Sequence, residues 1–400
     1  MKDKKLFIIG GAAFFLFILI IAISISVSSQ KKKQELPCYN QTIIVWSPFK
    51  NYKYPEVSNE LKKYCLKIKV VEKSIDEIRN SLFSEISAGN IPDVVYVDSE
   101  FLIDNIKIFS QYKGKNINLD DYPDIISKIF NNKILAYPVT YDPLVLFWNK
   151  DLLYSAGYIE PPKTFEDMQN LIKQVRILEF DKIKTSPIAL GTANNIKPFS
   201  KIFLVFHKLL NRDYQLPPSF YKTLDFYTQF ANKDSEYYSW NPNMDDQLEE
   251  FSNGNVAMII DFYSKKNDIL KKNNRLNFDI ALLPKFKDNP RSLNYFYGYF
   301  FAVPKQGKTK FAWMFIESLD KKYEKFVKSV NLIPAKKSFY DKLDKEGKIV
   351  FQSILNSDMF LEFNKKYLED ALKKDIEDWI YRKEDIKRLL QSQIYNFFKK

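Results

Sequence analysis

The stretch ILAYPVTYDPLVLFWNKDLLYSAGYIEPPKTFEDMQ, residues 134–169, holds the clearest run of structural signals in the chain. An apolar segment stops at Pro138, which cannot donate to a sheet, and the apolar run at 144–148 follows, short enough for a strand buried on both faces. A helix closed by Gly157 comes next, and Thr164 then caps a second helix, with an acid three residues later. This order of elements is typical of α/β proteins in general.

Before this stretch, the hydrophobic pattern alternates between strands and helices. We expect strands at 42–46, 66–70 and 94–97, with helices at 55–64 and 74–88 between them. Strands that alternate with helices indicate a parallel sheet. Later in the chain, strands are expected at 188–190, 256–260 and 278–284, and helices at 165–177, 203–210, 221–232 and 310–319. The residues after 340 have helical periodicity.

The composition is that of a globular protein, and it excludes several kinds of site. Charged residues make up 28% of the chain and apolar residues 46%, and 400 residues are enough for two domains. His207 is the single histidine and lies in an apolar helix pattern, so sites with several histidine ligands are excluded. The ten glycines form no G-x-G or G-x-x-x-x-G-K motif, which excludes the common phosphate-binding loops. We expect no metal and no cofactor.

The formal net charge of +12 does not indicate a nucleic-acid partner. Proteins that bind nucleic acids usually concentrate their basic residues in one stripe. Here the lysines alternate with acids, as in KKDIED at 373–378, which favours a solvated surface.

Several blocks of sequence resemble one known family, the extracellular solute-binding proteins of the maltose-binding type. Within 134–169 the similar blocks are Tyr137-Pro138, Tyr141-Asp142, WNKDL at 148–152 and PKTFE at 162–166. Further blocks are the helix end and strand at 89–97 and the group Phe251, Gly254, Ala257 and Met258, where the spacing between Gly254 and Ala257 is one residue longer than in the family. The resemblance extends from Thr42 to Ser338 and fades after Tyr340.

The resemblance implies an α/β fold of two lobes with a hinged cleft; a transmembrane helix before the lobes, which the N-terminal sequence predicts below, is a departure from the family. Lobe 1 would comprise 40–141 and 297–338, and lobe 2 would comprise 142–296 and 339–400. The implied function is to bind a small molecule, a sugar or oligosaccharide, and to deliver it to the permease of an ABC importer after hinge closure. The protein would be a monomer and not an enzyme.

The N-terminal residues predict a single membrane anchor. Residues 6–27 form an apolar run of 22 residues without a charge, which is long enough to cross a bilayer and longer than the apolar core of a cleaved signal peptide. We therefore expect a cytoplasmic tail at 1–5, an anchor at 6–28 and a tether at 29–39, with the lobes on the extracellular side of the cell membrane. Cleavage near 26–28, at a pattern of small residues, is the alternative.

The two cysteines, Cys38 and Cys65, predict a disulfide. Cys38 precedes the first expected strand and Cys65 follows the first expected helix, and in a β-α-β unit these points lie at the same end of the layer. A chain outside the cytoplasm can keep such a bond. The alternative is a pair of free buried thiols.

The expected ligand site combines aromatic and carboxylate side chains. Tyrosine and tryptophan can stack on the flat C–H faces of sugars and hydrogen-bond to the hydroxyl groups. The candidate ligand-binding residues are Ser47, Phe49, Asp98, Ser99, Tyr141, Asp142, Asn194, Trp240, Asp261, Tyr263, Tyr297 and Tyr299. For each aromatic residue, ordinary core packing is the alternative. Two other functions stay open: a cell-surface glycoside hydrolase, which needs a pair of carboxylates at fixed spacing, and a sensing or adhesion protein without a role in transport.

Overall fold

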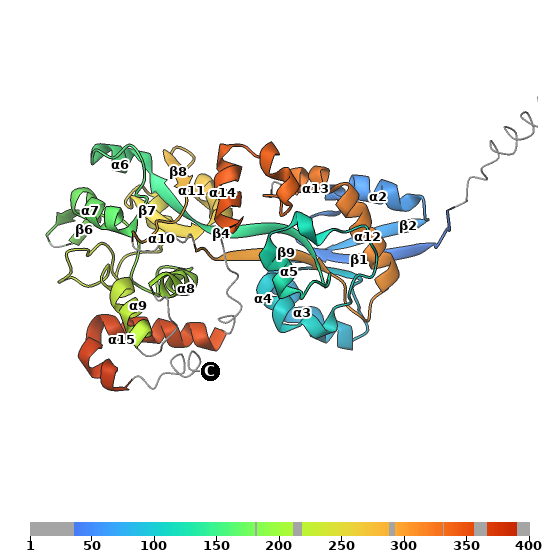
Figure 1. The fold of residues 1–400 in the computed structure, drawn as a ribbon, viewed down its shortest axis with the longest axis horizontal. Helices are drawn as coiled ribbons and strands as arrows, with labels where there is room; N and C mark the ends of the chain where they lie inside the picture. Colours follow the sequence, from blue (N-terminus) through green and yellow to red (C-terminus); the bar gives the residue numbers. More distant parts are fainter. Residues whose placement is uncertain are drawn as a thin grey trace, which may run out of the picture.

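The computed structural model of the protein describes residues 36–180, 182–210, 218–287, 293–330, 332–355 and 366–389. In this part, two α/β lobes lie side by side and share one mixed sheet (Figure 1). The long strand β4 (Tyr137–Asn149) runs from one lobe into the other, and β9 (Phe296–Ala302) returns beside it. The expected anchor at 6–28 lies outside the described residues. Among the described residues, no helix is both long and apolar enough to cross a membrane.

The sheet has the strand order β2-β1-β3-β9-β4-β7, and β8 also pairs with β4. The remaining strands of this sheet are β1 (Gln41–Ser47), β2 (Leu66–Glu72), β3 (Val94–Asp98), β7 (Met258–Phe262) and β8 (Phe278–Ala281). Strand β1 is parallel to β2 and β3, as the alternating pattern predicts. Every ladder of β9 and β4 is antiparallel, so the sheet as a whole is mixed, and the parallel pairing expected for the first three strands does not extend to the rest of it.

Strand β4 corrects the expectation of an apolar segment that ends at Pro138 and a separate strand at 144–148. The strand is continuous for 13 residues and is buried throughout. Its register shifts between Pro138 and Thr140, and an irregularity of this kind tolerates a residue that cannot donate to the ladder. Pro143 lies where β4 leaves β9 and begins to pair with β7 and β8. Both prolines therefore lie at breaks in the pairing.

The helices cover both faces of the shared sheet (Figure 1). Lobe 1, which contains β1, β2, β3, β9 and the first half of β4, carries α2 (Pro55–Lys62), α3 (Ile75–Ser87), α4 (Ser99–Asp104), α5 (Asp124–Ile129), α12 (Thr309–Lys321) and α13 (Tyr323–Val330). Lobe 2 carries α6 (Lys150–Ser155), α7 (Phe165–Val175), α8 (Phe199–Leu210), α9 (Pro218–Thr228), α10 (Gln247–Ser252), α11 (Lys266–Lys272) and α15 (Lys366–Leu389). Short 3-10 turns lie at Asn51–Lys53, Ile106–Ile108, Leu119–Asp121, Tyr263–Lys265 and Lys337–Lys342.

Each lobe has its own hydrophobic core, and the two cores meet at the shared strands. Along β4 the core of lobe 1 ends with Tyr141, and the core of lobe 2 begins with Leu144. Helix α14 (Lys345–Leu355) lies at the same junction, because its Val350 packs into lobe 2 and its Ile354 into lobe 1. The two lobes are thus connected by two strands and one helix.

Local capping signals set the starts of helices as the sequence predicts. Ser74 and Glu77 form a reciprocal capping box at α3, and the Thr164 hydroxyl accepts the amide of Asp167 at α7.

The hairpin of β5 (Ile177–Glu179) and β6 (Lys182–Thr185) was not expected. Its strands are three and four residues long and largely exposed, so they leave little hydrophobic pattern in the sequence.

The start of the described chain is fastened to lobe 1. Cys38 and Cys65 form a disulfide, with their Cα atoms 4.9 Å apart. The amide of Tyr39 also donates to the carbonyl of Tyr64 at 2.9 Å. The chain therefore enters β1 beside the start of β2, at the end of lobe 1 that lies far from lobe 2 (Figure 1).

Candidate functional site

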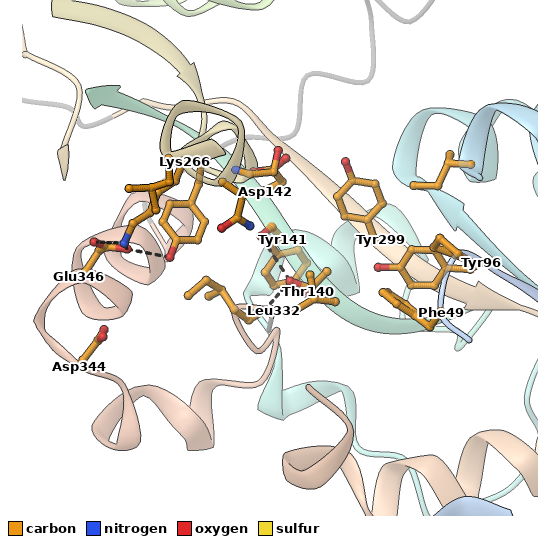
Figure 2. Close-up of a pocket in the computed structure, with 17 residues that line it drawn as sticks. Phe49, Tyr96, Thr140, Tyr141, Asp142, Lys266, Tyr299, Leu332, Asp344 and Glu346 are labelled. Carbon is orange, nitrogen blue, oxygen red and sulfur yellow. Dashed lines mark hydrogen bonds and ion pairs between the residues drawn. The ribbon is translucent and has the colours of Figure 1, made fainter. Parts of the chain in front are cut away.

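A cavity of about 530 Å³ lies between the lobes, which is a usual size for a small-molecule site. Lobe 1 contributes Phe49 and Tyr96, lobe 2 contributes Tyr263 and Ser264, and the crossing strand β4 contributes the wall between them. Asp344 and Glu346, at the start of α14, line the end of the cavity that lies away from Tyr96 (Figure 2). A ligand in this cavity would touch both lobes at once.

Aromatic rings form the lobe 1 side of the cavity. Tyr299 of β9 stacks on Tyr96 of β3, with ring centres 5.9 Å apart and an interplanar angle of 5°. Phe49, which follows β1, meets Tyr96 edge-on at 5.0 Å. The three rings stand together at one end of the cavity in Figure 2. They offer an apolar surface that carries two hydroxyl groups.

Asp142 places a buried carboxylate in the same cavity. It lies where β4 crosses between the lobes and is 5% exposed. Its oxygen accepts the backbone amide of Ser264 at 2.9 Å. Burial raises the pKa of Asp142 to about 6, although the hydrogen bond from Ser264 acts in the opposite direction. The carboxylate can accept further hydrogen bonds from a ligand, because ionised oxygens have several acceptor positions.

A second polar group joins α11 to α14 at the opposite end of the cavity. Lys266 donates to both oxygens of Glu346, at 2.6 and 2.7 Å, and the hydroxyl of Tyr263 donates to the same carboxylate at 2.8 Å (Figure 2). The charge of Lys266 is therefore matched inside the protein. The cavity consequently has little attraction for an anion.

A smaller cavity of about 110 Å³ contains Asp261 and Tyr297. Asp261 is 2% exposed and accepts hydrogen bonds from Gln247 Nε2 at 2.9 Å and from the Phe262 amide at 2.8 Å. Burial raises its pKa to about 7, and the nearby charge of Asp142 contributes in the same direction. The ring of Tyr297 packs against Phe262, with ring centres 4.8 Å apart.

The structure brings some of the twelve candidate residues together and separates others. The larger cavity is lined by Phe49, Tyr141, Asp142, Tyr263 and Tyr299, and the smaller one by Asp261 and Tyr297. The remaining candidates line neither cavity; they are Ser47, Asp98, Ser99, Asn194 and Trp240.

Those five residues have partners within the protein instead. Ser47 bonds to the Tyr54 hydroxyl, Asp98 caps α4 and pairs with Arg79, and Ser99 accepts the amide of Gly298. Asn194 donates to the carbonyl of Pro242, and the indole of Trp240 is buried in the core of lobe 2, where it donates to Asn195.

Several lining residues were not anticipated from the sequence. Among them are Tyr96, Thr140, Ser264, Lys266, Asp344 and Glu346. Tyr96 lies inside an apolar strand pattern, so the sequence alone places it in the hydrophobic core. Lys266 and Glu346 are 80 residues apart, and Glu346 lies where the resemblance to the family has faded, so no local signal connects them.

A buried ion pair bridges the lobes beside the smaller cavity. Lys201 of α8 in lobe 2 contacts Glu100 of α4 in lobe 1 at 2.7 Å, and their side chains are 6% and 12% exposed. The hydroxyl of Tyr295 donates to the same Glu100 oxygen at 2.9 Å. The polar atoms of this bridge satisfy one another only while the two lobes are in contact.

The two raised carboxyl pKa values predict how stability depends on pH. Because the folded pKa of Asp261 exceeds its unfolded value, its contribution is present at low pH and is lost as pH rises through about 7. As pH rises from about 4 to 7, Asp261 should therefore lower the free energy of unfolding by about 1.4 kcal/mol per pH unit. Asp142 should lower the free energy of unfolding in the same way as pH rises, up to its folded pKa of about 6. Urea unfolding at several pH values should show a shallower dependence for Asp261→Asn than for the wild type.

The exposed residue Asp341 supplies the control for this prediction. Asp341→Asn should leave the pH dependence unchanged. An equal slope in the wild type and Asp261→Asn would contradict the assignment of the raised pKa to Asp261.

Solved structures with the same fold are two-lobed binding proteins. The cyclic alpha-maltosyl-1,6-maltose binding protein of Arthrobacter globiformis matches with a TM-score of 0.71 and 15% identity, over 90% of this chain and 99% of that one. UgpB of Mycobacterium tuberculosis, in complex with glycerophosphocholine, matches with a TM-score of 0.69 and 15% identity, over 90% and 96%. MalE of Listeria monocytogenes, in complex with maltose, gives 0.65 and 19%, over 90% and 95%. The expected two-lobed fold is confirmed.

The family follows from the sequence match. The model for bacterial extracellular solute-binding proteins matches residues 59–349, so the chain belongs to this family of binding proteins. One curated relative is the maltodextrin-binding protein MdxE of Bacillus subtilis (strain 168), which is 29% identical over 148 residues. That match covers 34% of this chain and 32% of MdxE, about a third of each. The resemblance to extracellular solute-binding proteins is thereby confirmed.

Proposed function

We propose that the protein binds a sugar or oligosaccharide in the cavity between its lobes and delivers it to the permease of an ABC importer. The observation that carries this proposal is the combination of the aromatic wall at Tyr96 and Tyr299 with the buried carboxylate of Asp142 in one cavity. The proposal is supported by MdxE, whose name refers to maltodextrin, and by MalE of Listeria monocytogenes, solved with maltose.

The chemistry of the cavity fits a neutral, polyhydroxylated ligand. A sugar ring has an apolar face that can pack on tyrosine, and hydroxyl groups that can donate to a carboxylate. A hydrogen bond to a charged group contributes about 1.5–3 kcal/mol net. An anionic ligand would be repelled by Asp142, and Lys266 is already paired with Glu346.

Hinge closure is the proposed mechanism, with lobe 1 at 40–141 and 297–338 and lobe 2 at 142–296 and 339–400. The lobes contact each other through the cavity walls and through the bridge of Glu100 and Lys201. Ligand contacts from both sides would stabilise the closed form, and a permease would recognise that form.

We propose further that residues 6–28 form a single-pass anchor, with 1–5 in the cytoplasm and the lobes outside the cell on the tether 29–39. The support is the uncharged apolar run of 22 residues at 6–27. Protein purified from cell membranes should retain residues 1–28, which N-terminal sequencing can measure. A mature protein that begins at Ser29 would contradict the anchor.

The ligand site can be tested by substitution at Asp142. A thermal-shift screen of the extracellular part against saccharides should first identify a ligand, because a ligand that binds only the native state raises the melting temperature. Asp142→Asn should then weaken binding by about one to two decades, since it removes a charged acceptor. Tyr299→Ala should weaken it through lost packing. Isothermal titration calorimetry measures both effects.

The exposed residue Tyr52 supplies a matched control, because Tyr52→Ala removes an aromatic ring from lobe 1 outside the cavity. It should bind like the wild type. Unchanged affinity in both Asp142→Asn and Tyr299→Ala would place the ligand elsewhere in the protein.

A further inference from the structure

We propose that the ligand site continues past the first turn of α14 into a second, larger groove, and that the protein therefore takes an oligosaccharide long enough to occupy both spaces. This inference rests on the proposed sugar-binding function and deepens it. The second groove has a volume of about 1200 Å³, whereas the cavity between the lobes has about 530 Å³. Sites for a single small molecule usually occupy about 300–1,000 Å³.

The two spaces are neighbours across the start of α14. Asp344 and Glu346 line both of them, whereas Lys345 and Ile349 line only the second. Figure 2 shows Asp344 and Glu346 at the edge of the cavity, on the side away from Tyr96. A chain-like ligand that leaves the cavity at this edge would pass the carboxylate of Glu346 and enter the second groove.

The second groove has the apolar and aromatic surface that a sugar chain can pack on. Tyr154 meets Trp148 edge-on, with ring centres 6.2 Å apart, and remains 49% exposed. Ile159 is 81% exposed on the same groove, and Phe286 lines it as well. Half-exposed aromatic rings are suited to contacts that bury one apolar face and leave a polar group in water.

Three of the lysines around the groove are paired with acidic side chains. Lys150 contacts Asp279 at 3.0 Å, and Lys163 contacts Glu160 at 2.7 Å. Lys287 lies 3.5 Å from Asp167. These pairs offer many hydrogen-bond donors and acceptors, and because their charges are opposite they create no strong positive or negative potential over the groove. This arrangement favours a neutral hydroxylated chain over an anionic or cationic partner.

The groove belongs to lobe 2 and α14 and receives no side chain from the first strands or helices of lobe 1. It therefore does not depend on the closure of the lobes. A long ligand can settle on the groove while the cavity is open, and closure then adds the contacts with Tyr96 and Tyr299. A short ligand has only the cavity.

The test is calorimetric titration of the full-length protein with maltose and maltohexaose, and with the corresponding manno- and cello-oligosaccharides. Within the series that binds, we expect the hexasaccharide to bind at least about ten-fold more tightly than the disaccharide. Tyr154→Ala should weaken binding of the hexasaccharide about five- to ten-fold, the effect of one lost aromatic contact, and leave the disaccharide unchanged. Tyr381→Ala removes an exposed ring from α15 outside the groove and is the control.

Three other outcomes would overturn the inference, and they are distinguishable. If the disaccharide and the hexasaccharide bind equally and Tyr154→Ala affects neither, the site ends at α14 while the proposed function stands. If Tyr154→Ala reduces uptake in cells but no binding affinity, the groove is a docking face for a protein. If no saccharide of the three series binds, the proposed function fails, and this inference fails with it.

Discussion

Lys201→Met should open the two lobes of the ligand-free protein. Removal of one partner from a buried ion pair costs about 3–5 kcal/mol, because the other charge is left without compensation. Here the remaining charge is Glu100, which keeps the hydroxyl of Tyr295 as a hydrogen-bond partner but loses its buried ion pair. Separation of the lobes would return Glu100 to water, so the penalty falls on the closed form. Small-angle X-ray scattering should show a larger radius of gyration than for the wild type.

A second variant separates the loss of the ion pair from the burial of a lone charge. Glu100→Gln/Lys201→Met removes both charges, and replacing a whole buried pair is often nearly neutral. We expect this double variant to recover most of the compaction. Lys325→Met, which breaks the exposed pair with Glu56 within lobe 1, should have little effect. Identical scattering from the wild type and Lys201→Met would show that the bridge does not hold the lobes together.

Removal of the disulfide should lower the free energy of unfolding by about 3.5 kcal/mol. Cys38 and Cys65 are 27 residues apart in the sequence, and the chain-entropy model gives this value for a loop of that length. The double variant Cys38→Ser/Cys65→Ser leaves both core clusters intact, because neither cysteine belongs to them. Chemical unfolding of the wild type and the variant measures the difference.

The reduced wild type is the control for the disulfide, since it should unfold at the same denaturant concentration as the double variant. Labelling of the unfolded, unreduced wild type should detect no free thiol. Equal stability of the oxidised wild type and the double variant would mean that the bond restricts the unfolded chain very little.

Local signals made much of the fold predictable. The caps at Ser74 and Thr164 depend on residues three positions apart, so they are visible in the sequence and present in the structure. The position of Asp142 in the cavity was anticipated from the resemblance of the block around Tyr137-Pro138 to solute-binding proteins. That block is specific because several short motifs occur in one order.

Contacts between distant segments could not be predicted in the same way. Glu100 and Lys201 are 101 residues apart, and Lys201 lies in a helix whose pattern is apolar. Trp240 shows a related limit, because a tryptophan can be a ligand contact or a core residue, and here its ring packs in the core of lobe 2. The antiparallel pairing of β9 depends on where the chain returns after lobe 2, which no local pattern records.

The place of β9 in the sheet also determines the order in which the protein can be assembled during synthesis. Strand β9 lies between β3 and β4, although it follows both in the chain, after the strands of lobe 2. The ribosome releases residues in sequence order, so the edge of β3 stays unpaired until Phe296–Ala302 emerges, and unpaired edges invite aggregation. Strand β4 meets β7 and β8 earlier. We therefore expect the nascent lobe 1, although it is made first, to complete its sheet last and to need protection until then.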